Sequence, residues 1–89
     1  MGNSKTREYH IKLSNIIRCY LLLNKGKDCT ANEIARWISF NGFAFRDGVS
    51  SHNVSNEIRR NNKGDRLLQD VIVTDRTNNS PKKYRIDPV

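Results

Sequence analysis

The chain has 89 residues, of which 36% are hydrophobic, and a mean hydropathy of −0.74. Sixteen Lys and Arg residues against nine Asp and Glu residues give a formal net charge of +7 at pH 7. A chain of this length forms one small domain, which disfavours a two-domain enzyme and a large enclosed substrate cavity. Its positive potential concentrates polyanions, so the charge points to nucleic acid, to an anionic membrane or to solubility alone.

Targeting patterns are few. Residues 20–23 form the longest apolar run, far shorter than the roughly 20 residues that span a membrane. No secretory signal opens the chain, so we expect a cytoplasmic protein without a membrane partner, associated with the nucleoid if its source is a prokaryote or a phage. Residues 1–6 match the short template for myristoylation at Gly2. We favour the alternative, in which residues 1–8 are a mobile basic arm, because that template is tolerant.

Four side chains are candidate thiol or metal-binding groups: Cys19, Cys29, His10 and His52. They have none of the paired spacings of a zinc site, so we expect neither a metal nor a cofactor. In a basic chain without a secretory signal, the cysteines are expected to be free thiols. The acidic residues form no cluster for a divalent metal and no nucleophile–base set is evident, so we expect no enzymatic activity.

A first helix is predicted over residues 9–24, because apolar residues recur there at steps of three and four. This stripe consists of Tyr9, Leu13, Ile16, Ile17, Tyr20 and Leu23. Residues 24–26 end the helix with a basic last turn and a glycine that tolerates the left-handed conformation. Ile11 and Leu22 lie nearly opposite the stripe, and are either ordinary exposed residues or a contact with a second subunit.

A second helix is predicted to begin after Thr30, because Thr30 and Glu33 have the spacing of a capping box. Its buried face is expected to consist of Ala31, Ile34, Ala35 and Ile38, with Trp37 at the edge. Residues 41–42 end this helix. Residues 43–48 form a connecting loop, whose Phe43 and Phe45 are expected to lie under the helices.

A third helix is predicted from about Ser51 to Asn62, with Ser50 or Ser51 as its cap. At about 100° per residue, Val54 and Ile58 form a thin apolar seam on one side. The opposite side is centred on Asn56 and carries only hydrogen-bonding and cationic groups, which are His52, Asn53, Asn56, Arg59 and Arg60. Residues 63–65 then break the helix.

The last part of the chain changes to the period of β-strands. Residues 67–74 are rich in β-branched side chains, residues 83–87 alternate strictly, and residues 75–81 between them are typical of a turn. This pattern predicts a β-hairpin whose polar, basic tip carries Arg76, Lys82 and Lys83. A very short strand at residues 28–29 can extend the edge of the hairpin.

The predicted fold is α+β, a three-helix bundle followed by a two-stranded antiparallel β-hairpin, and it resembles the winged-helix superfamily of DNA-binding proteins. The resemblance covers residues 9–87 as one domain. It rests on the capped second helix (residues 30–35), the polar third helix (residues 51–61) and the Asn78-Asn79 wing. The connection formed by residues 42–50 is longer than the roughly three or four residues of a tight helix-turn-helix. The angle between the second and third helices is therefore not predicted.

The resemblance implies that the third helix reads base edges in the major groove of DNA while the wing contacts the backbone or the adjacent minor groove. The side-chain chemistry agrees, because Asn pairs bidentately with adenine and Arg with guanine. The residues expected to read bases are His52, Asn53, Asn56, Arg59 and Arg60. Those expected to bind the backbone are Ser51, Lys63, Arg66, Arg76, Asn78, Asn79, Lys82 and Lys83. The sequence therefore predicts sequence-specific binding of duplex DNA, most simply by a small transcriptional regulator.

Alternatives stay open at this point. A polar helix side is often only a solvated surface. A winged helix can also serve as a protein-interaction module, an assembly factor or inhibitor, although the third helix offers no apolar patch. Duplex RNA fits the charge, but its deep, narrow major groove does not admit a helix. We predict a monomer or a weak homodimer through the first helix, because Ile11 and Leu22 bury too little area for an obligate dimer.

Overall fold

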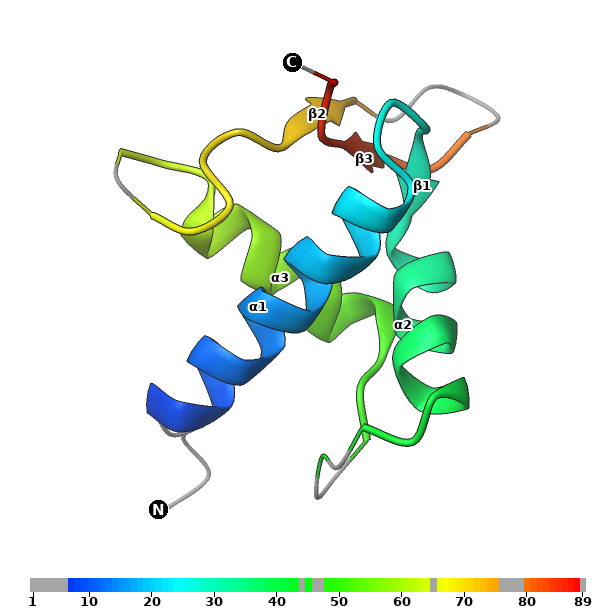
Figure 1. Cartoon of the computed structure of the whole chain (residues 1–89), viewed down its shortest axis with the longest axis vertical. Helices are drawn as coiled ribbons and strands as arrows, with labels where there is room; N and C mark the ends of the chain where they lie inside the picture. The colour runs from blue at the N-terminus through cyan, green and yellow to red at the C-terminus, as the bar shows by residue number, and fades with distance from the viewer. Residues whose placement is uncertain (1–6, 44, 46–47, 65, 76–79, 89) are drawn as a thin grey trace.

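A computed structural model describes residues 7–43, 45, 48–64, 66–75 and 80–88. Within these residues the chain forms three helices and an open, three-stranded antiparallel sheet, which makes it a small α+β domain. The elements are α1 (Arg7–Leu23), β1 (Cys29–Thr30), α2 (Ala31–Phe40), α3 (Ser51–Asn61), β2 (Ile72–Thr74) and β3 (Lys83–Arg85). The strands lie together at one end of the helices, and α1 crosses α3 (Figure 1).

Both α2 and α3 begin with a reciprocal cap. At α2 the Thr30 hydroxyl oxygen accepts a hydrogen bond from the Glu33 amide at 3.1 Å, and the Glu33 carboxylate accepts one from the Thr30 amide at 2.8 Å. The predicted capping box is therefore confirmed. At α3 the cap is Ser50, whose amide donates to the Asn53 Oδ1 atom at 2.9 Å, and the helix ends at Asn61, one residue before the predicted end. Local side-chain chemistry thus determines where both helices start.

The bounds of α1 differ from the prediction at both ends. The helix begins at Arg7, so Arg7 and Glu8 belong to it and not to an amino-terminal arm, and residues 1–6 lie outside the described residues. It ends at Leu23, which leaves its last turn without the predicted basic residue. Gly26 then adopts a φ of +86° and donates its amide hydrogen to the Ile86 carbonyl at 2.8 Å. A glycine accepts this backbone conformation without strain, and it turns the chain toward the end of β3.

The core is formed by the inward sides of the three helices together with residues of the sheet. Its fully buried side chains include Leu13, Ile17, Leu21, Ile34, Ile38, Val54, Ile58 and Leu68. The predicted seam of α3 and the predicted face of α2 are confirmed. In α1 the stripe runs to Leu21, whereas Leu23, which the periodicity places on the stripe, is 73% exposed. Steps of four residues from Leu13 lead to Leu21, and Leu23 falls outside that line.

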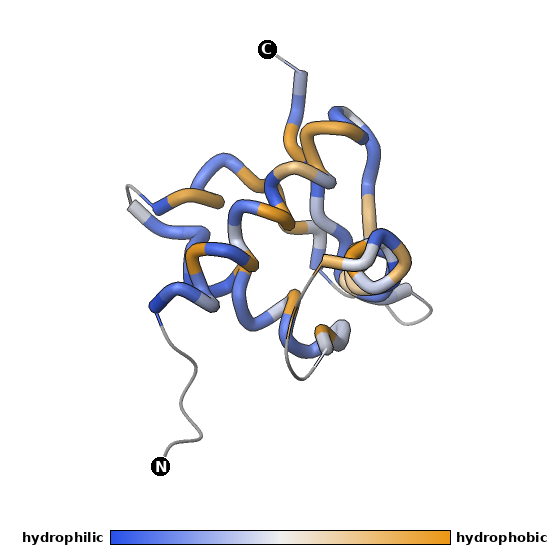
Figure 2. The backbone as a smooth tube through the Cα atoms, turned by 60° about the horizontal axis from the view of Figure 1, so that its bottom comes forward, coloured by the Kyte–Doolittle hydropathy of each residue, from blue (hydrophilic) through white to orange (hydrophobic). Residues whose placement is uncertain are grey.

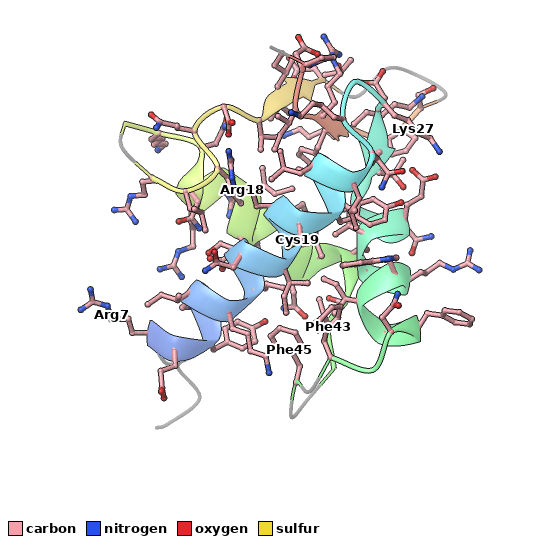
Figure 3. The ribbon with its side chains drawn as sticks, viewed as in Figure 1. Arg7, Arg18, Cys19, Lys27, Phe43 and Phe45 are labelled. Carbon is pink, nitrogen blue, oxygen red and sulfur yellow. The ribbon has the colours of Figure 1, made fainter. Side chains whose placement is uncertain are left out.

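The two phenylalanines of the loop after α2 pack less deeply than predicted. Phe45 is partly buried and contacts Tyr9 edge to face, with 5.7 Å between ring centroids. Phe43 lies 5.3 Å from Trp37 between ring centroids, yet it is one of the exposed large apolar side chains. In the view of Figure 3 both labelled side chains lie between α1 and the loop that follows α2. Only Phe45 therefore lies under the helices in the predicted sense.

In the sheet, β3 is the central strand, with β1 on one side and β2 on the other. Val73 pairs with Tyr84 in the hairpin, and Cys29 pairs with the same Tyr84 from the opposite edge. The predicted hairpin is confirmed, and the short strand that was optional in the prediction makes the sheet three-stranded rather than two-stranded. Residues 76–79 of the predicted tip, which include Arg76, Asn78 and Asn79, lie outside the described residues.

The first strand of the hairpin is shorter than predicted, because residues 67–70 form a turn and β2 begins only at Ile72. The Leu68 amide donates to the Asn61 carbonyl at 3.1 Å, and the Asn62 side-chain amide donates to the Leu68 and Val71 carbonyls at 2.8 and 2.9 Å. These hydrogen bonds occupy backbone groups that a strand would offer to its neighbour. The buried Leu68 therefore belongs to a core-packed turn and not to a strand.

Hydrophobic residues are interspersed with hydrophilic ones along the backbone rather than gathered in one segment (Figure 2). Even α1, the longest helix with 17 residues, carries Glu8, Lys12 and Arg18. Among the described residues, no helix combines the length and the apolar character needed to cross a membrane.

Candidate nucleic-acid interface

A groove separates α3 from the hairpin and is called the α3–hairpin groove below. Its lining on the α3 side includes Ser51, His52, Ser55, Asn56, Arg59 and Lys63. On the other side it is lined by Val73, Pro81, Lys82 and Tyr84, and residues 30–32 at the start of α2 complete the wall. The groove thus brings together three predicted base-reading residues and three predicted backbone-binding residues from separate parts of the chain.

Three side chains on the groove side of α3 are linked by hydrogen bonds and form the His52–Asn56–Arg59 network. The Arg59 Nη2 atom donates to the Asn56 Oδ1 atom at 2.9 Å, and the Asn56 Nδ2 atom donates to the His52 Nε2 atom at 3.0 Å. Spacings of three and four residues place these side chains one above another on the helix. Only the amide oxygen can accept from a guanidinium, so Arg59 sets the orientation of the Asn56 amide. The His52 Nε2 atom then accepts, which requires it to be unprotonated.

Positive charge lies on both walls of the groove. Arg59 and Lys63 lie on the α3 side, and Lys82 lies on the hairpin side. Among the described residues that line the groove, none is an Asp or a Glu. With no carboxylate to neutralise these cations locally, the groove keeps a field that attracts anions.

Two arginines outside the groove are paired with carboxylates instead. Arg18 donates to both carboxylate oxygens of Asp70, at 2.6 and 3.0 Å, and reaches from α1 toward the segment that follows α3 (Figure 3). These hydrogen bonds hold the pKa of Asp70 below its ordinary value. Arg85 pairs in the same way with Asp28 and Asp87. Arg18 and Arg85 therefore each have an acidic partner, unlike the cations of the groove.

Two of the predicted base-reading residues, Asn53 and Arg60, lie outside the groove. Asn53 is half-buried, and its Oδ1 atom caps α3. Arg60 points toward α1, where its Nη1 atom lies 2.9 Å from the His10 Nε2 atom. Arg60 follows Arg59 by about 100° around the helix axis, which carries it from the groove to the side that faces α1. Arg66, a predicted backbone contact, lines a depression on that same side.

Two further predicted backbone contacts, Lys82 and Lys83, lie at the start of β3. Lys83 is half-buried on β3, opposite Thr30 in β1 and Thr74 in β2, and does not line the groove. Lys82, one residue earlier, does. Arg76, Asn78 and Asn79 lie outside the described residues.

Glu57 is a buried acidic residue, only 2% exposed, whose role was not predicted from the sequence. Its Oε1 atom lies 2.6 Å from the His10 Nδ1 atom, and its Oε2 atom accepts from the Asn61 Nδ2 atom at 2.7 Å. The sequence carries a signal for this burial, because Glu57 lies about 60° from Val54 around the helix axis. A carboxylate is tolerated in such a place only when both oxygens have partners.

Comparisons of the chain with protein-family models, with curated proteins and with solved structures find no match. Its function therefore has to follow from the chemistry of the interface. An exposed network of donors and acceptors between two cationic walls suits a ligand with hydrogen-bonding edges flanked by phosphates.

Proposed function

We propose that this is a winged-helix protein that binds duplex DNA non-covalently and with sequence specificity, as a small transcriptional regulator without enzymatic activity. The order of the elements supports the proposal, since three helices precede a hairpin that is joined by the short strand between α1 and α2. The net charge of +7 supports a polyanionic partner.

The observation that carries the proposal is the His52–Asn56–Arg59 network, exposed on α3 between the cations Lys63 and Lys82. The major groove of B-DNA is about 12 Å wide, which admits one α-helix, and its base edges pair with forked donors and acceptors. While its Nη2 atom bonds to Asn56, Arg59 keeps further N–H donors for the O6 and N7 atoms of guanine. Asn56 can exchange its two internal hydrogen bonds for the edge of an adenine.

The cations at the periphery bind phosphates in this proposal. Lys63 and Ser51 act from the two ends of α3, and Lys82 acts from the hairpin. The wing residues Lys83, Arg76, Asn78 and Asn79 extend this contact along the backbone or into the adjacent minor groove. Asn53 has no base contact, because its acceptor oxygen is used by the cap.

A titration with random-sequence duplex DNA at several salt concentrations tests the proposal. If about four to six phosphates are neutralised, log K should fall against log salt with a slope of about −4 to −5. Selection from a randomised duplex pool then measures the base preference. A slope near zero would exclude nucleic acid as the main partner, and a pool that stays random would exclude sequence specificity.

A second candidate function, a protein-interaction module, is favoured by one side chain. Phe40, the last residue of α2, is 92% exposed and lies outside the α3–hairpin groove. Exposed aromatic side chains are frequent anchors of protein interfaces. The two candidates differ in the titration, because a module that binds protein through Phe40 gives no steep salt dependence with any duplex.

A further inference from the structure

Three arginines from three parts of the chain line one depression on the α1 side of α3, called the arginine depression below. Arg7 lies in the first turn of α1, Arg60 in the last turn of α3, and Arg66 in the segment that follows α3. Figure 3 shows Arg7 pointing outward from the start of α1. This depression is separate from the α3–hairpin groove, because none of its lining residues lines that groove.

Among the described residues, no exposed carboxylate lines the arginine depression. Among its described lining residues the one carboxylate is Glu57, which is buried and has both oxygens engaged by His10 and Asn61. Like charges gathered on one concave surface repel each other, and a bound anion removes that repulsion. The structural arginines Arg18 and Arg85, in contrast, each have a carboxylate partner.

Arg60 is also held in place, which a merely solvated arginine is not. The Arg60 Nη1 atom lies 2.9 Å from the His10 Nε2 atom and 3.4 Å from its Nδ1 atom, so the guanidinium lies against the imidazole ring, whose Nδ1 atom is also 2.6 Å from the Glu57 Oε1 atom. The buried Glu57 thus orients His10, and His10 orients Arg60. A guanidinium fixed in this way loses less side-chain freedom on binding and keeps further donors for an anion.

We infer that Arg7, Arg60 and Arg66 form a phosphate-binding site, in which Glu57 and His10 are positioning residues for Arg60. The occupant we assign, a phosphate of the DNA backbone, rests on the proposed function. When the groove side of α3 enters the major groove, its α1 side faces one of the two backbones that border that groove. The hairpin with Lys82 faces the other, so the protein contacts both strands.

Salt-dependent titrations of the double variant Arg7→Ala/Arg66→Ala with random-sequence duplex DNA test this site. Each phosphate contact contributes a slope of about −0.9, so the slope should become shallower by about 2. The base preference in the selection experiment should stay unchanged. The matched control is Arg36→Ala/Lys25→Ala, which removes the same charge from exposed positions outside both the groove and the depression. A change equal to that of the control would overturn the site while the proposed function stands.

A second measurement separates failure of the site from failure of the proposed function. The side-chain Nε–H signals of Arg7, Arg60 and Arg66 are followed by NMR while a short duplex or inorganic phosphate alone is added to the intact protein. Shifts with the duplex support the assignment. Shifts with phosphate alone, in a protein that binds no duplex, support the site but replace its occupant with a free phosphate group. No shift with either ligand overturns the site.

The positioning role of His10 is tested by a double-mutant cycle on duplex affinity. If His10 acts through Arg60, His10→Ala should lower the affinity by itself, and should add nothing once Arg60→Ala is present. Unfolding in urea is measured for each variant so that affinities are compared among folded proteins. Additive losses of affinity would overturn the positioning role, because a general structural effect of His10 does not depend on Arg60.

Discussion

The two sides of α3 differ in where their polar groups find hydrogen-bond partners. On the groove side, His52, Asn56 and Arg59 bond to one another and stay at the surface. On the α1 side, Glu57 is buried and bonds to His10 of another helix. Water can replace the exposed bonds while a ligand exchanges with them, whereas a buried carboxylate that loses a partner stays unsatisfied. One helix thus carries one side whose hydrogen bonds can be exchanged and one side whose buried hydrogen bonds cannot.

The largest expected effect is on stability, and it tests this division directly. Replacing Glu57 by Ala removes the carboxylate partner of His10 and one of the two acceptors of the Asn61 side-chain amide, so it should lower the free energy of unfolding by about 2–3 kcal/mol. Replacing Asn56 by Ala, on the exposed side, should change it by less than about 0.5 kcal/mol. Urea denaturation measures both. Equal losses from the two variants would show that the groove side is also structural.

The next effect is on DNA affinity and should have the opposite pattern. Replacing Arg59 by Ala should cost about 1–3 kcal/mol of binding to the preferred site and relax base preference, because a base contact is lost. Replacing Arg36, an exposed arginine of α2 outside the groove, should leave base preference unchanged.

Lys82, on the hairpin side of the groove, should affect DNA binding differently from Arg59. Replacing Lys82 by Ala should weaken binding to all duplexes alike and reduce the salt slope by about one. Titrations with selected and random duplexes distinguish the two outcomes. If Lys82→Ala altered base preference and Arg59→Ala did not, the roles of helix and hairpin would be reversed.

A smaller effect is expected from an arginine that has a carboxylate partner. Arg18 depresses the pKa of Asp70 in the folded state, so the pair contributes stability above the ordinary Asp pKa of about 4 and loses it as the pH falls through the folded-state value. Because both side chains are partly exposed, the contribution should stay below about 1 kcal/mol. Asp70→Asn should therefore be less stable than the wild type at pH 7 and equally stable near pH 2. A difference that persists in acid would mean that the ion pair is not its cause.

Self-association should be the weakest effect. Ile11 and Leu22 are 51% and 40% exposed on α1, which is too little apolar area for an obligate dimer. Sedimentation at micromolar concentration should give a monomer or a weak dimer that Ile11→Glu/Leu22→Glu abolishes. Because Ile11 also lines the arginine depression, such a dimer would compete with phosphate there. A tight dimer that survives both changes would place the contact elsewhere, for which the more exposed Leu23 and Phe40 are the candidates.

Much of the fold could be predicted from short-range chemistry. Thr30 and Glu33 satisfy each other's backbone partners within one turn of helix, so their spacing alone located the start of α2. The alternation around Tyr84 located β3 in the same way. The strand predicted over residues 67–70 was wrong because an apolar pair such as Leu67 and Leu68 can also occur in a turn. Here Asn61 and Asn62 stabilise that turn, and Leu68 is its buried residue.

The candidate site, too, could be predicted only where the argument depended on residues close together in the sequence. Helical spacing was enough to place His52, Asn56 and Arg59 on one side of α3, because three- and four-residue steps bring side chains together whatever surrounds the helix. Helical spacing could not show that Arg59 lines the groove and Arg60 does not, because both arginines project within about 60° of Asn56 around the helix axis. The position of α1 distinguishes the two arginines, because it brings His10 next to Arg60.

The sequence by itself determined the positive charge, the helix caps, the hairpin and the polar side of α3, because each depends on composition or on residues a few positions apart. The tertiary structure alone decided which neighbour each side of α3 meets. Periodicity gives the angle of a side chain around its own helix axis and nothing about what packs there. The burial of Glu57 against His10, and the gathering of Arg7 with Arg60 and Arg66, depend on how α1 crosses α3 and on where the chain turns after it.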